Sequence, residues 1–384
     1  LDKQYQTQST DAFAMETENA NCWYDAKSQS LHMVLSVQKP QEVIDHALQM
    51  LKVSSVPVKS LYLQPTYTVG YGSKDSSNHT YYSLVAALYG DGLPVRVALN
   101  RYENFQASLK RHAFSLRYRL AVNKATKKIE AFQSRVECNS GGRSSFSPSI
   151  MRQSTIQSAG IYYIPKCDLR GQANATRALD ASAIRGFGSL QSVGAMEMLA
   201  DEMAQSVDMD AIDFRLLNAM RTGFSTAQGA VPAGQVRIVE VLNQAKKHPI
   251  WTERALRKKT FEQANPDKFY GAGFGCAQKS FGTGREAAFA KIEISADGRI
   301  TIYHPGVEMG TGIAMTQAVV CKPWFGQAAH EVKLGITDWS DLPMEQIGDP
   351  NTNKQADEDR WSRDNPRWTP QYVSSSGATN TAYY

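Results

Sequence analysis

The stretch Ala183-Ile-Arg185-Gly186-Phe187-Gly188-Ser-Leu-Gln191 stands directly before a helical pattern in this chain of 384 residues. Glycines let backbone amides approach a ligand closely, and the N-terminus of a helix attracts anions. An arginine guanidinium can bind phosphate or an oxo group through paired hydrogen bonds. The stretch therefore predicts a tight turn that leads into a helix and holds an anion. A salt-bridged turn arginine is the alternative for Arg185.

Strand and helix patterns alternate on both sides of this turn, which favours an α+β fold of mixed sheets with packed helices. The expected strands and helices cover residues 31–37, 41–52, 60–69, 84–88, 192–207 and 210–220, with Asp210 as a helix cap. Two hairpins are expected, one over 113–138 with its turn at 123–126 and one over 288–303. The segment 348–371 has no periodicity and is expected to be a surface excursion.

The composition is that of a globular protein, with 42% hydrophobic and 21% charged residues. The net charge of +5 comes from scattered basic residues, which argues against nucleic-acid binding. Residues 110–119 are the densest basic patch, but apolar residues alternate with the basic ones. The patch is therefore interpreted as the solvated face of a strand.

The five cysteines lie far apart without a Cys-x-x-Cys pair, and the seven histidines lack metal-ligand spacing. This spacing predicts neither an iron–sulfur cluster, nor a zinc site, nor any other metal held by side chains. There is no signal peptide and no apolar run of membrane-spanning length, so a cytoplasmic location is expected, with the periplasm as the alternative. The chain starts at Leu1 without a methionine and stops at Tyr384 within an apparent element, so we expect a section of a longer protein.

Four further elements accompany the turn at Arg185. Gln38 closes the first strand, and Gly70-Tyr71-Gly72 follows the next one. The string His304-Pro-Gly-Val-Glu308-Met-Gly-Thr-Gly312 precedes a helix-like stretch, and residues 374–381 read Ser-Ser-Ser-Gly-Ala-Thr-Asn-Thr. Loops of this kind, if they converge, suit a large polar ligand that carries phosphate.

In this order, the elements resemble the molybdopterin-binding large subunit of the xanthine oxidase family of molybdenum hydroxylases. The resemblance covers nearly the whole chain, from Phe13-Ala-Met-Glu16-Thr to its end. Its other anchors are Pro94-Val-Arg96, Tyr162-Tyr-Ile-Pro165, Phe214-Arg-Leu-Leu-Asn218 and Gly306-Val-Glu-Met-Gly-Thr-Gly312. It implies a first molybdopterin-binding half at 1–245, whose N-terminal part in the family is absent here, and a linker at 246–269. The start of a second, truncated half would cover 270–384, with a surface insertion at about 348–371.

The resemblance also implies roles for individual residues. Cofactor contacts are expected from Gln38, Tyr71, Gly72, Arg185, Met309, Gly310, Thr311, Ala378, Thr379 and Asn380. The substrate pocket is expected to contain Asp75, Gln153, Phe187 and Phe281. Taken singly, the two phenylalanines could be core residues, Gln38 a solvated polar cap, and Asp75 and Gln153 surface residues. Asp75 and Gln153 replace residues that handle the heterocycle in purine-oxidising members, so a purine substrate is not expected.

The expected function is hydroxylation of an aldehyde or an N-heterocycle with an oxygen atom derived from water. The metal would be held by the pterin, in its cytosine dinucleotide form as one option. Electrons would pass to 2Fe–2S and FAD centres on partner subunits or on sequence outside this chain, and an oligomer is expected. The family's general base is a glutamate in a Gly-Val-Gly-Glu string, which this sequence lacks. No catalytic residue is therefore assigned, and Glu308 is interpreted as part of a cofactor loop.

Two other functions fit the same residues. One is a non-catalytic cofactor-binding or assembly module of the same family, suggested by the missing glutamate. The other is a nucleotide-binding protein that uses Gly186 and Gly188 for phosphates. The sequence has neither a Gly-x-x-x-x-Gly-Lys-Ser/Thr string nor a Gly-x-Gly-x-x-Gly string after a strand, which disfavours nucleotide binding.

Overall fold

The computed structural model describes residues 1–384 except 71, 73, 75–77, 144, 233, 279–285, 288–289, 343–344, 347–353, 370 and 373–384. The chain forms two compact units. Unit 1 contains Leu1–Thr10 and Lys110–Ser280, and unit 2 contains Asp11–Leu109 and Phe281–Tyr384. The predicted halves and the predicted linker concern the family's domains, and they stay predictions.

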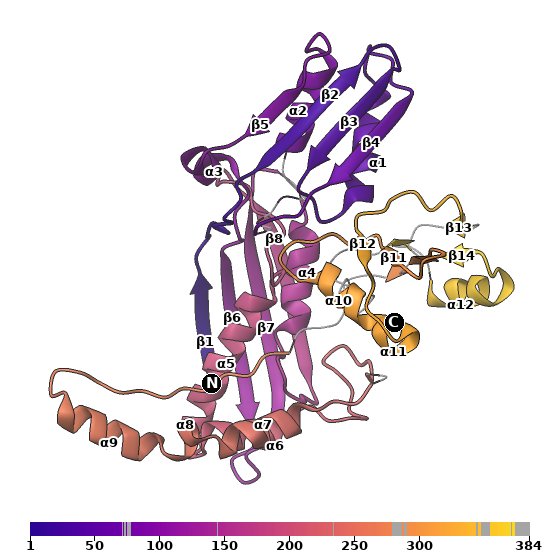
Figure 1. Ribbon diagram of the computed structural model, residues 1–384. Coiled ribbons are helices and arrows are strands. Elements are labelled where there is room, and N and C mark those ends of the chain that lie inside the picture. Colours follow the sequence, from indigo (N-terminus) through magenta and orange to yellow (C-terminus); the bar gives the residue numbers. More distant parts are fainter. Residues whose placement is uncertain are drawn as a thin grey trace. The chain divides into compact units, whose positions relative to one another are not determined.

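Unit 1 is built on one four-stranded sheet with the order β1-β6-β7-β8 (Figure 1). The first three strands are antiparallel and β8 runs parallel to β7. The strands and helices of the unit are β1 (Asp2–Thr7), β6 (Phe114–Val122), β7 (Ile129–Gly141), β8 (Cys167–Ala175), α4 (Ser147–Gln157), α5 (Ser189–Ser206), α6 (Ala211–Asn218), α7 (Ile238–Lys247), α8 (Pro249–Thr252) and α9 (Arg254–Ala264).

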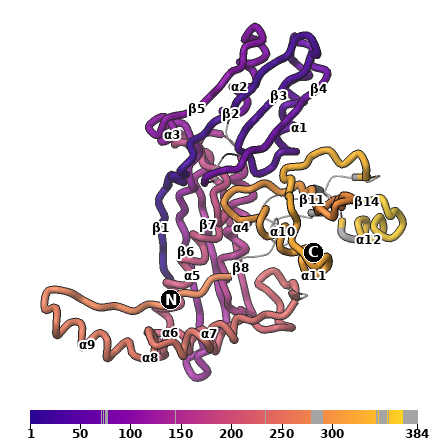
Figure 2. The backbone as a smooth tube through the Cα atoms, viewed as in Figure 1, coloured from indigo at the N-terminus to yellow at the C-terminus, as the bar shows by residue number. Residues whose placement is uncertain are grey.

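The hairpin predicted over 113–138 is confirmed by β6 and β7, whose long antiparallel pair is visible in the backbone trace (Figure 2). Its turn is closed by the Asn123 side chain, which accepts hydrogen bonds from the backbone N–H groups of Ala125 at 2.9 Å and Thr126 at 3.1 Å. Phe114, Leu116, Tyr118 and Leu120 are all buried. Arg117 and Arg119, on the other face of β6, are exposed, so the solvated strand face is confirmed there. The prediction is wrong for Lys110 and His112, which are buried and precede the strand.

Helices α4 and α5 contact each other, and they contact β7 and β6 respectively (Figure 1). Met196, Leu199 and Met203 of α5 are buried in the same core as the apolar face of β6. The predicted cap of the next helix is also confirmed, because the Asp210 carboxylate accepts from the N–H groups of Ile212 at 2.8 Å and Asp213 at 3.2 Å. Local sequence thus places both the sheet and the helix that follows the Arg185 turn.

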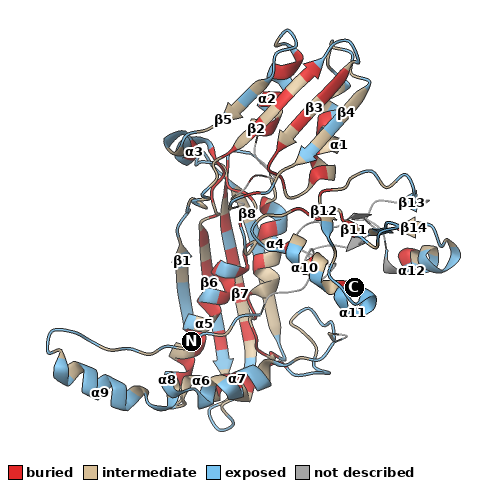
Figure 3. Cartoon of the chain, viewed as in Figure 1, coloured by how far each residue is buried: buried red, intermediate tan, exposed pale blue. Residues whose placement is uncertain are grey.

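Unit 2 contains a second mixed sheet with the order β4-β3-β2-β5, in which β3 and β4 are parallel and the other pairs antiparallel. Figure 3 shows buried residues along β2 and β3, and α1 and α2 pack on this sheet. The elements around this sheet are β2 (Asn19–Asp25), β3 (Ser30–Leu35), α1 (Pro40–Leu51), β4 (Ser60–Pro65), α2 (His79–Leu88), β5 (Val95–Ala98) and α3 (Arg101–Ala107).

The rest of unit 2 contains a small sheet, β10-β11-β12. The predicted second hairpin is confirmed by β10 and β11. The predicted surface excursion at 348–371 contains a helix, α12, which the sequence interpretation missed. The elements of this region are β9 (Glu286–Ala287), β10 (Lys291–Ile294), β11 (Ile300–Tyr303), α10 (Ile313–Val320), α11 (Lys322–Phe325), β12 (Glu331–Lys333), β13 (Glu345–Gln346), α12 (Gln355–Asp364), β14 (Trp368–Thr369) and β15 (Gln371–Tyr372).

Within the described ranges, no helix combines the length and the apolar character that crossing a membrane requires.

Candidate functional site

The turn at residues 184–191, called the Arg185 turn below, is a pair of tight turns that ends in α5. The backbone N–H of Phe187 donates to the carbonyl oxygen of Ile184 at 2.9 Å, and that of Ser189 donates to Gly186 at 3.0 Å. Gly186, Phe187 and Gly188 have φ angles of +102°, +49° and +89°. Such angles are rare outside glycine, so the glycine spacing of this stretch sets the backbone path.

Gly188 is required by close packing as well as by its backbone angle. A Cβ atom on Gly188 would lie 2.5 Å from the carbonyl oxygen of Ile150 and 3.1 Å from the Cβ of Ser154, both in α4. The turn is therefore pressed against α4. Gly186 differs, because a Cβ built there would make only ordinary contacts, with the Leu190 Cβ at 3.5 Å, the Arg111 Nη1 atom at 3.7 Å and the Leu190 backbone nitrogen at 3.9 Å.

Residues 110–112 brace the Arg185 turn from the side. The backbone of Lys110 donates to Asp180 at 2.9 Å and accepts from Ser182 at 3.0 Å. The Arg111 side chain donates through Nη2 to the carbonyl oxygen of Arg185 at 3.0 Å. One residue later, the carbonyl oxygen of His112 accepts from the Gln191 amide at 3.3 Å. The basic patch noted in the sequence thus begins with residues that hold the turn in place.

His112 is a buried neutral residue at the base of this brace. Its Nε2 atom lies 2.8 Å from the Ser147 hydroxyl oxygen. Burial, together with the positive charge of Arg111, lowers the pKa of His112 to about 4. An imidazole with this pKa is uncharged near neutral pH and serves as packing and as a hydrogen-bond partner. Burial also lowers the pKa of the Arg111 guanidinium from its ordinary value.

Two of the predicted substrate-pocket residues lie beside the Arg185 turn. Phe187 is half-buried, and its ring packs against that of Phe146 with the centroids 6.2 Å apart. Gln153 is in α4, the helix whose Ile150 and Ser154 contact Gly188, and it is partly exposed. Arg185 itself is exposed. The structure therefore brings Arg185, Phe187 and the helix of Gln153 together in unit 1.

In unit 2, the loop that contains Gly70 and Gly72 is anchored by an ion pair that the sequence interpretation did not identify. The buried Lys74 ammonium donates to the carbonyl oxygens of Glu16 at 2.9 Å and Gly70 at 2.8 Å. Burial lowers the pKa of Lys74, which the charge of Glu16 opposes. The Glu16 carboxylate accepts from Ser36 and, at 2.9 Å, from the backbone of Val69.

The pKa of Glu16 lies below its ordinary value. Burial on its own would raise it, but the hydrogen bonds from Ser36 and from the Val69 backbone outweigh burial. The carboxylate is therefore ionised and paired with Lys74, whose ammonium nitrogen is 3.9 Å away. These contacts link Glu16, Val69, Gly70 and Lys74, so Glu16 and Lys74 support the described residues around Gly70.

Residues 304–312, called the Glu308 turn below, contain a carboxylate that accepts hydrogen bonds from backbone amides of the same turn. One Glu308 carboxylate oxygen accepts from the backbone N–H groups of Gly310 at 2.8 Å and Gly312 at 3.0 Å, and the other accepts from Ala314 at 3.4 Å. Gly310 and Gly312 have φ angles of +91° and +74°. Glu308 thus caps α10, because its carboxylate accepts the hydrogen bonds that those three amides donate.

The Glu308 turn also meets the loop that follows β4, since the backbone N–H of Thr68 donates to the carbonyl oxygen of Glu308 at 3.0 Å. The structure therefore brings the predicted Gly72 loop and the predicted 309–311 segment into one region of unit 2. Gln38 follows the end of β3 by three residues and is partly exposed. Met309 is partly exposed, and Gly310 and Thr311 are exposed.

Several predicted residues lie outside the described part of the chain, and their roles stay predictions. They are Tyr71, Asp75, Phe281, Ala378, Thr379 and Asn380. The predicted contacts of the described residues with a cofactor stay predictions as well.

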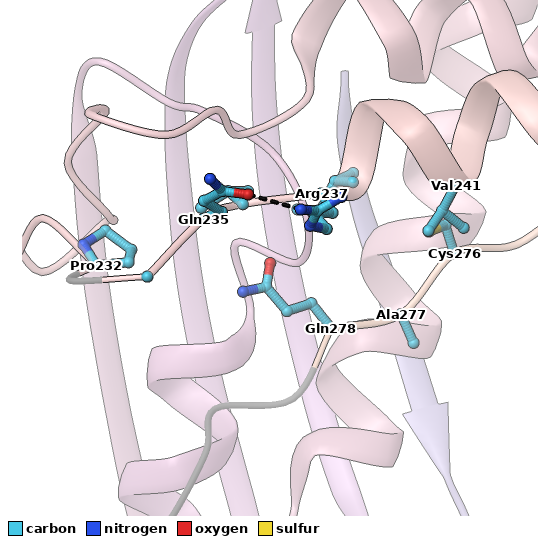
Figure 4. Close-up of a pocket in the computed structure, with 10 residues that line it drawn as sticks. Pro232, Gln235, Arg237, Val241, Cys276, Ala277 and Gln278 are labelled. Carbon is cyan, nitrogen blue, oxygen red and sulfur yellow. Dashed lines mark hydrogen bonds between the residues drawn. The ribbon is translucent and has the colours of Figure 1, made fainter.

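A separate cavity of about 380 Å³ in unit 1 contains none of the predicted site residues (Figure 4). It is lined by Pro232, residues 234–238, Val241 and residues 276–278. The Arg237 guanidinium beside it already donates to Glu240 at 2.8 Å and to Gln235 at 2.7 Å. Among the described residues, no group of three or more His, Cys, Asp or Glu side chains could hold a metal ion.

Both glycine turns stand at the start of a helix, with Gly188 at the N-cap of α5 and Gly312 at the N-cap of α10. Residues 1–219 and 244–348 each match a family model described as a molybdopterin cofactor-binding domain. The chain belongs to this family. The resemblance to the xanthine oxidase family and the α+β fold class are thereby confirmed.

Curated relatives and solved structures agree with this assignment. A putative xanthine dehydrogenase molybdenum-binding subunit of Escherichia coli is 26% identical over 342 residues, which cover 88% of this chain and 44% of that protein. The nicotinate dehydrogenase large molybdopterin subunit of Eubacterium barkeri is 26% identical over 64% of this chain and 57% of its own length. The chain therefore spans about half the length of these relatives.

The fold is shared with two solved structures. Quinoline 2-oxidoreductase from Pseudomonas putida aligns with a TM-score of 0.76 over 100% of this chain and 48% of its own, at 16% identity. Aldehyde oxidoreductase from Desulfovibrio gigas aligns with a TM-score of 0.68 over 87% of this chain and 36% of its own, at 20% identity.

The sequence interpretation missed three residues that support the predicted site, namely Glu16, Lys74 and Arg111. Glu16 stands in the Phe13-Ala-Met-Glu16-Thr string that carried part of the resemblance, so its position in a motif was an available signal. Arg111 gave no local signal, because the carbonyl group that it holds lies 74 positions further along the chain.

Proposed function

We propose that this chain is the cofactor-binding part of a molybdenum hydroxylase that oxidises an aldehyde or an N-heterocycle. The observation that carries the proposal is the Arg185 turn. Its exposed arginine, its left-handed glycines and the start of α5 form a cradle for an anionic, phosphate-bearing cofactor. Relatives named xanthine dehydrogenase and nicotinate dehydrogenase support the same class of reaction.

The residues present fit a pterin cofactor. In the described part of unit 1, neither Arg185 nor Arg111 has a carboxylate partner, so both cations are available to an anion. Gly186 lies beside Arg111 and adds no side chain of its own. Gln38, Gly72, Arg185, Met309, Gly310 and Thr311 are the described residues proposed to hold the cofactor, together with Tyr71, Ala378, Thr379 and Asn380.

When bound, the molybdenum of such a cofactor supplies a Lewis acid and an electron acceptor for inserting an oxygen atom derived from water. The part of this chain is to bind and to orient. Arg185 would hold the anionic edge of the cofactor, and Phe187 with Gln153, Asp75 and Phe281 would hold the flat substrate. The cytosine dinucleotide form, the 2Fe–2S and FAD centres on partners, and an oligomer are included in the proposal.

The enzyme proposal requires a general base from polypeptide outside these 384 residues, because this sequence has no Gly-Val-Gly-Glu string. Glu308 is unsuited to that task, since its carboxylate accepts three backbone N–H groups. A non-catalytic cofactor-binding or assembly module of the same family is the second proposal, favoured by the same missing string. The cytoplasm is the proposed compartment, with the periplasm as the alternative, and the five free cysteines suit a reducing environment.

Elemental and pterin analysis of the protein tests the proposal directly. The chain is produced in cells that make the cofactor and then purified. We expect about one molybdenum and one pterin per chain. Absence of both would refute cofactor binding. Presence of both without turnover of aldehydes or N-heterocycles, in a sample that includes the full-length polypeptide and its partners, would favour the non-catalytic module.

A further inference from the structure

Among the residues that the structure describes, Arg111 is a half-buried cation without an acidic partner. Other arginines of unit 1 with reduced exposure are matched by carboxylates: the fully buried Arg215 donates to Glu197 at 2.9 Å and to Asp201 at 2.7 Å, and the partly buried Arg135 pairs with Asp168 at 2.5 Å. In the described part of the chain, the Arg111 side chain makes a single hydrogen bond, to the carbonyl oxygen of Arg185. Placing a cation in this position is unfavourable unless an anion compensates it.

The Nη1 atom of Arg111 lies beside Gly186. A Cβ atom on Gly186 would lie 3.5 Å from the Leu190 Cβ, 3.7 Å from Arg111 Nη1 and 3.9 Å from the backbone nitrogen of Leu190. This point is therefore close to a cationic nitrogen and to a backbone amide from the first turn of α5, with the Leu190 Cβ also in contact. Because residue 186 is a glycine, no side chain of its own fills this point.

Arg111 does more than a carbonyl clamp requires. One N–H group is enough to hold the Arg185 carbonyl, and a neutral side chain such as glutamine could donate it. The arginine adds a full positive charge and further N–H groups, which a planar fork can direct to an oxyanion. The charge is costly where it lies, so its presence points to an anion that arrives with a ligand.

We propose that Arg111 is a second cation of the cofactor site and binds, together with Arg185, a phosphate oxygen of the pterin cofactor beside Gly186. This inference rests on the proposed function. Arg111 has two tasks in it: Nη2 positions the Arg185 backbone, and the rest of the guanidinium contacts the phosphate.

The test compares Arg111→Met, which keeps the stem and removes the charge, with Arg111→Lys, which keeps the charge and removes the fork. The matched control is Arg221→Met, because Arg221 is an exposed arginine of the same unit that donates to the carbonyl oxygen of Leu216 at 3.2 Å. Each variant is purified from cofactor-producing cells. Molybdenum and pterin are measured per chain, and the Tm is measured on cofactor-free protein.

Losing a hydrogen bond between charged groups weakens binding by about tenfold or more. We therefore expect Arg111→Met to lose most of its pterin, Arg111→Lys to retain an intermediate amount, and Arg221→Met to match the wild type. The Tm of cofactor-free Arg111→Met should stay close to that of the wild type. In the holoprotein, pterin release should rise with salt for the wild type, whereas the pterin left in Arg111→Met should be less salt-sensitive.

Wild-type pterin content in Arg111→Met would overturn the inference while leaving the proposed function intact. A lower Tm of cofactor-free Arg111→Met, with pterin loss equally large in Arg111→Lys, would overturn it as well, because Arg111 would then act only through the fold. Absence of pterin from the wild-type protein would instead refute the proposed function, and this inference with it.

Discussion

The Arg185 turn and the Glu308 turn look alike in sequence and differ in charge. Both place a glycine in the left-handed region at the N-cap of a helix, Gly188 before α5 and Gly312 before α10, and neither helix is capped by its N-cap side chain. The Glu308 carboxylate accepts hydrogen bonds from the backbone amides of Gly310, Gly312 and Ala314. The Arg185 turn instead has two arginines and no carboxylate within the described residues.

This difference teaches that glycine spacing selects the shape of a turn, while the neighbouring side chains decide what the turn binds. Amides that already donate to an internal carboxylate are poor donors to a phosphate. The anionic end of a cofactor is therefore better matched to the Arg185 turn. The Glu308 turn would contact a cofactor through the exposed Thr311, whose hydroxyl can donate and accept.

The largest expected effect on stability comes from removing Arg215, which supports the helix α5 that follows the Arg185 turn. Arg215 is fully buried and pairs with Glu197 and Asp201 of α5, and its guanidinium lies 5.5 Å from the centroid of the Phe274 ring. Arg215→Met leaves the Glu197 carboxylate, which is mostly buried, without this partner, so the free energy of unfolding should fall by about 3–5 kcal/mol. Urea unfolding measures the change.

Arg257→Met serves as the control for that prediction. Arg257 forms an exposed pair with Glu253 one helical turn away at 2.9 Å, so its loss should cost less than about 1 kcal/mol. Equal effects of the two substitutions would show that the Arg215 cluster does not support α5.

How much the sequence could predict follows from how far apart the interacting residues are. The Asp210 cap and the Asn123 turn were predictable because each involves residues two or three positions apart. The brace from Arg111 to Arg185 joins residues 74 positions apart, and no local pattern marks it. The Glu308 cap is local and could have been found, since an acid four residues before a glycine at a helix start can accept the free amides.

The helix α12 was missed for a different reason. Its ten residues, Gln355–Asp364, have little apolar character, so a search for hydrophobic periodicity finds nothing. The charges are arranged as a helix favours, with Asp357 and Glu358 in the first turn and Arg363 in the last. Charge position along the segment, rather than apolar spacing, was the signal available in the sequence.

The second prediction concerns pH, because each turn has one buried histidine at its base. Burial lowers the pKa of His112 and of His304 to about 4 each. The unfolded chain, with a histidine pKa of 6.5, binds protons first as the pH falls. Stability is therefore full above pH 6.5 and is lost toward pH 4, by about 2 kcal/mol per histidine at pH 5.

The measurement is urea unfolding at several values between pH 7 and pH 5, in the wild type and in His304→Asn. The asparagine oxygen can accept the Gly306 N–H that His304 Nδ1 accepts at 2.9 Å. The variant should lose about half as much stability over this range as the wild type does. A wild type whose stability does not change over this range would mean that neither histidine is held neutral.

The third prediction compares the two N-cap glycines. Gly312→Ala meets no atom within 4 Å, so only its left-handed backbone is penalised, by about 1–2 kcal/mol. Gly188→Ala has the same backbone penalty and also places its Cβ 2.5 Å from the Ile150 carbonyl oxygen. Thermal and urea unfolding should show Gly188→Ala to be less stable by roughly a further 2 kcal/mol. Equal losses would show that α4 can move away from the Arg185 turn at no cost.

The smallest expected effect comes from Glu308→Ala, which removes the internal anion of its turn. Loss of a carboxylate cap should reduce the free energy of unfolding by about 1 kcal/mol, and hydrogen exchange at Gly310 and Gly312 should accelerate because their amides lose an acceptor. Glu331→Ala removes an exposed charge from β12 of the same unit, and it should leave both observables unchanged. Unaltered exchange at both glycines in Glu308→Ala would mean that the carboxylate does not occupy these amides, and the two turns would then be equally open to an anion.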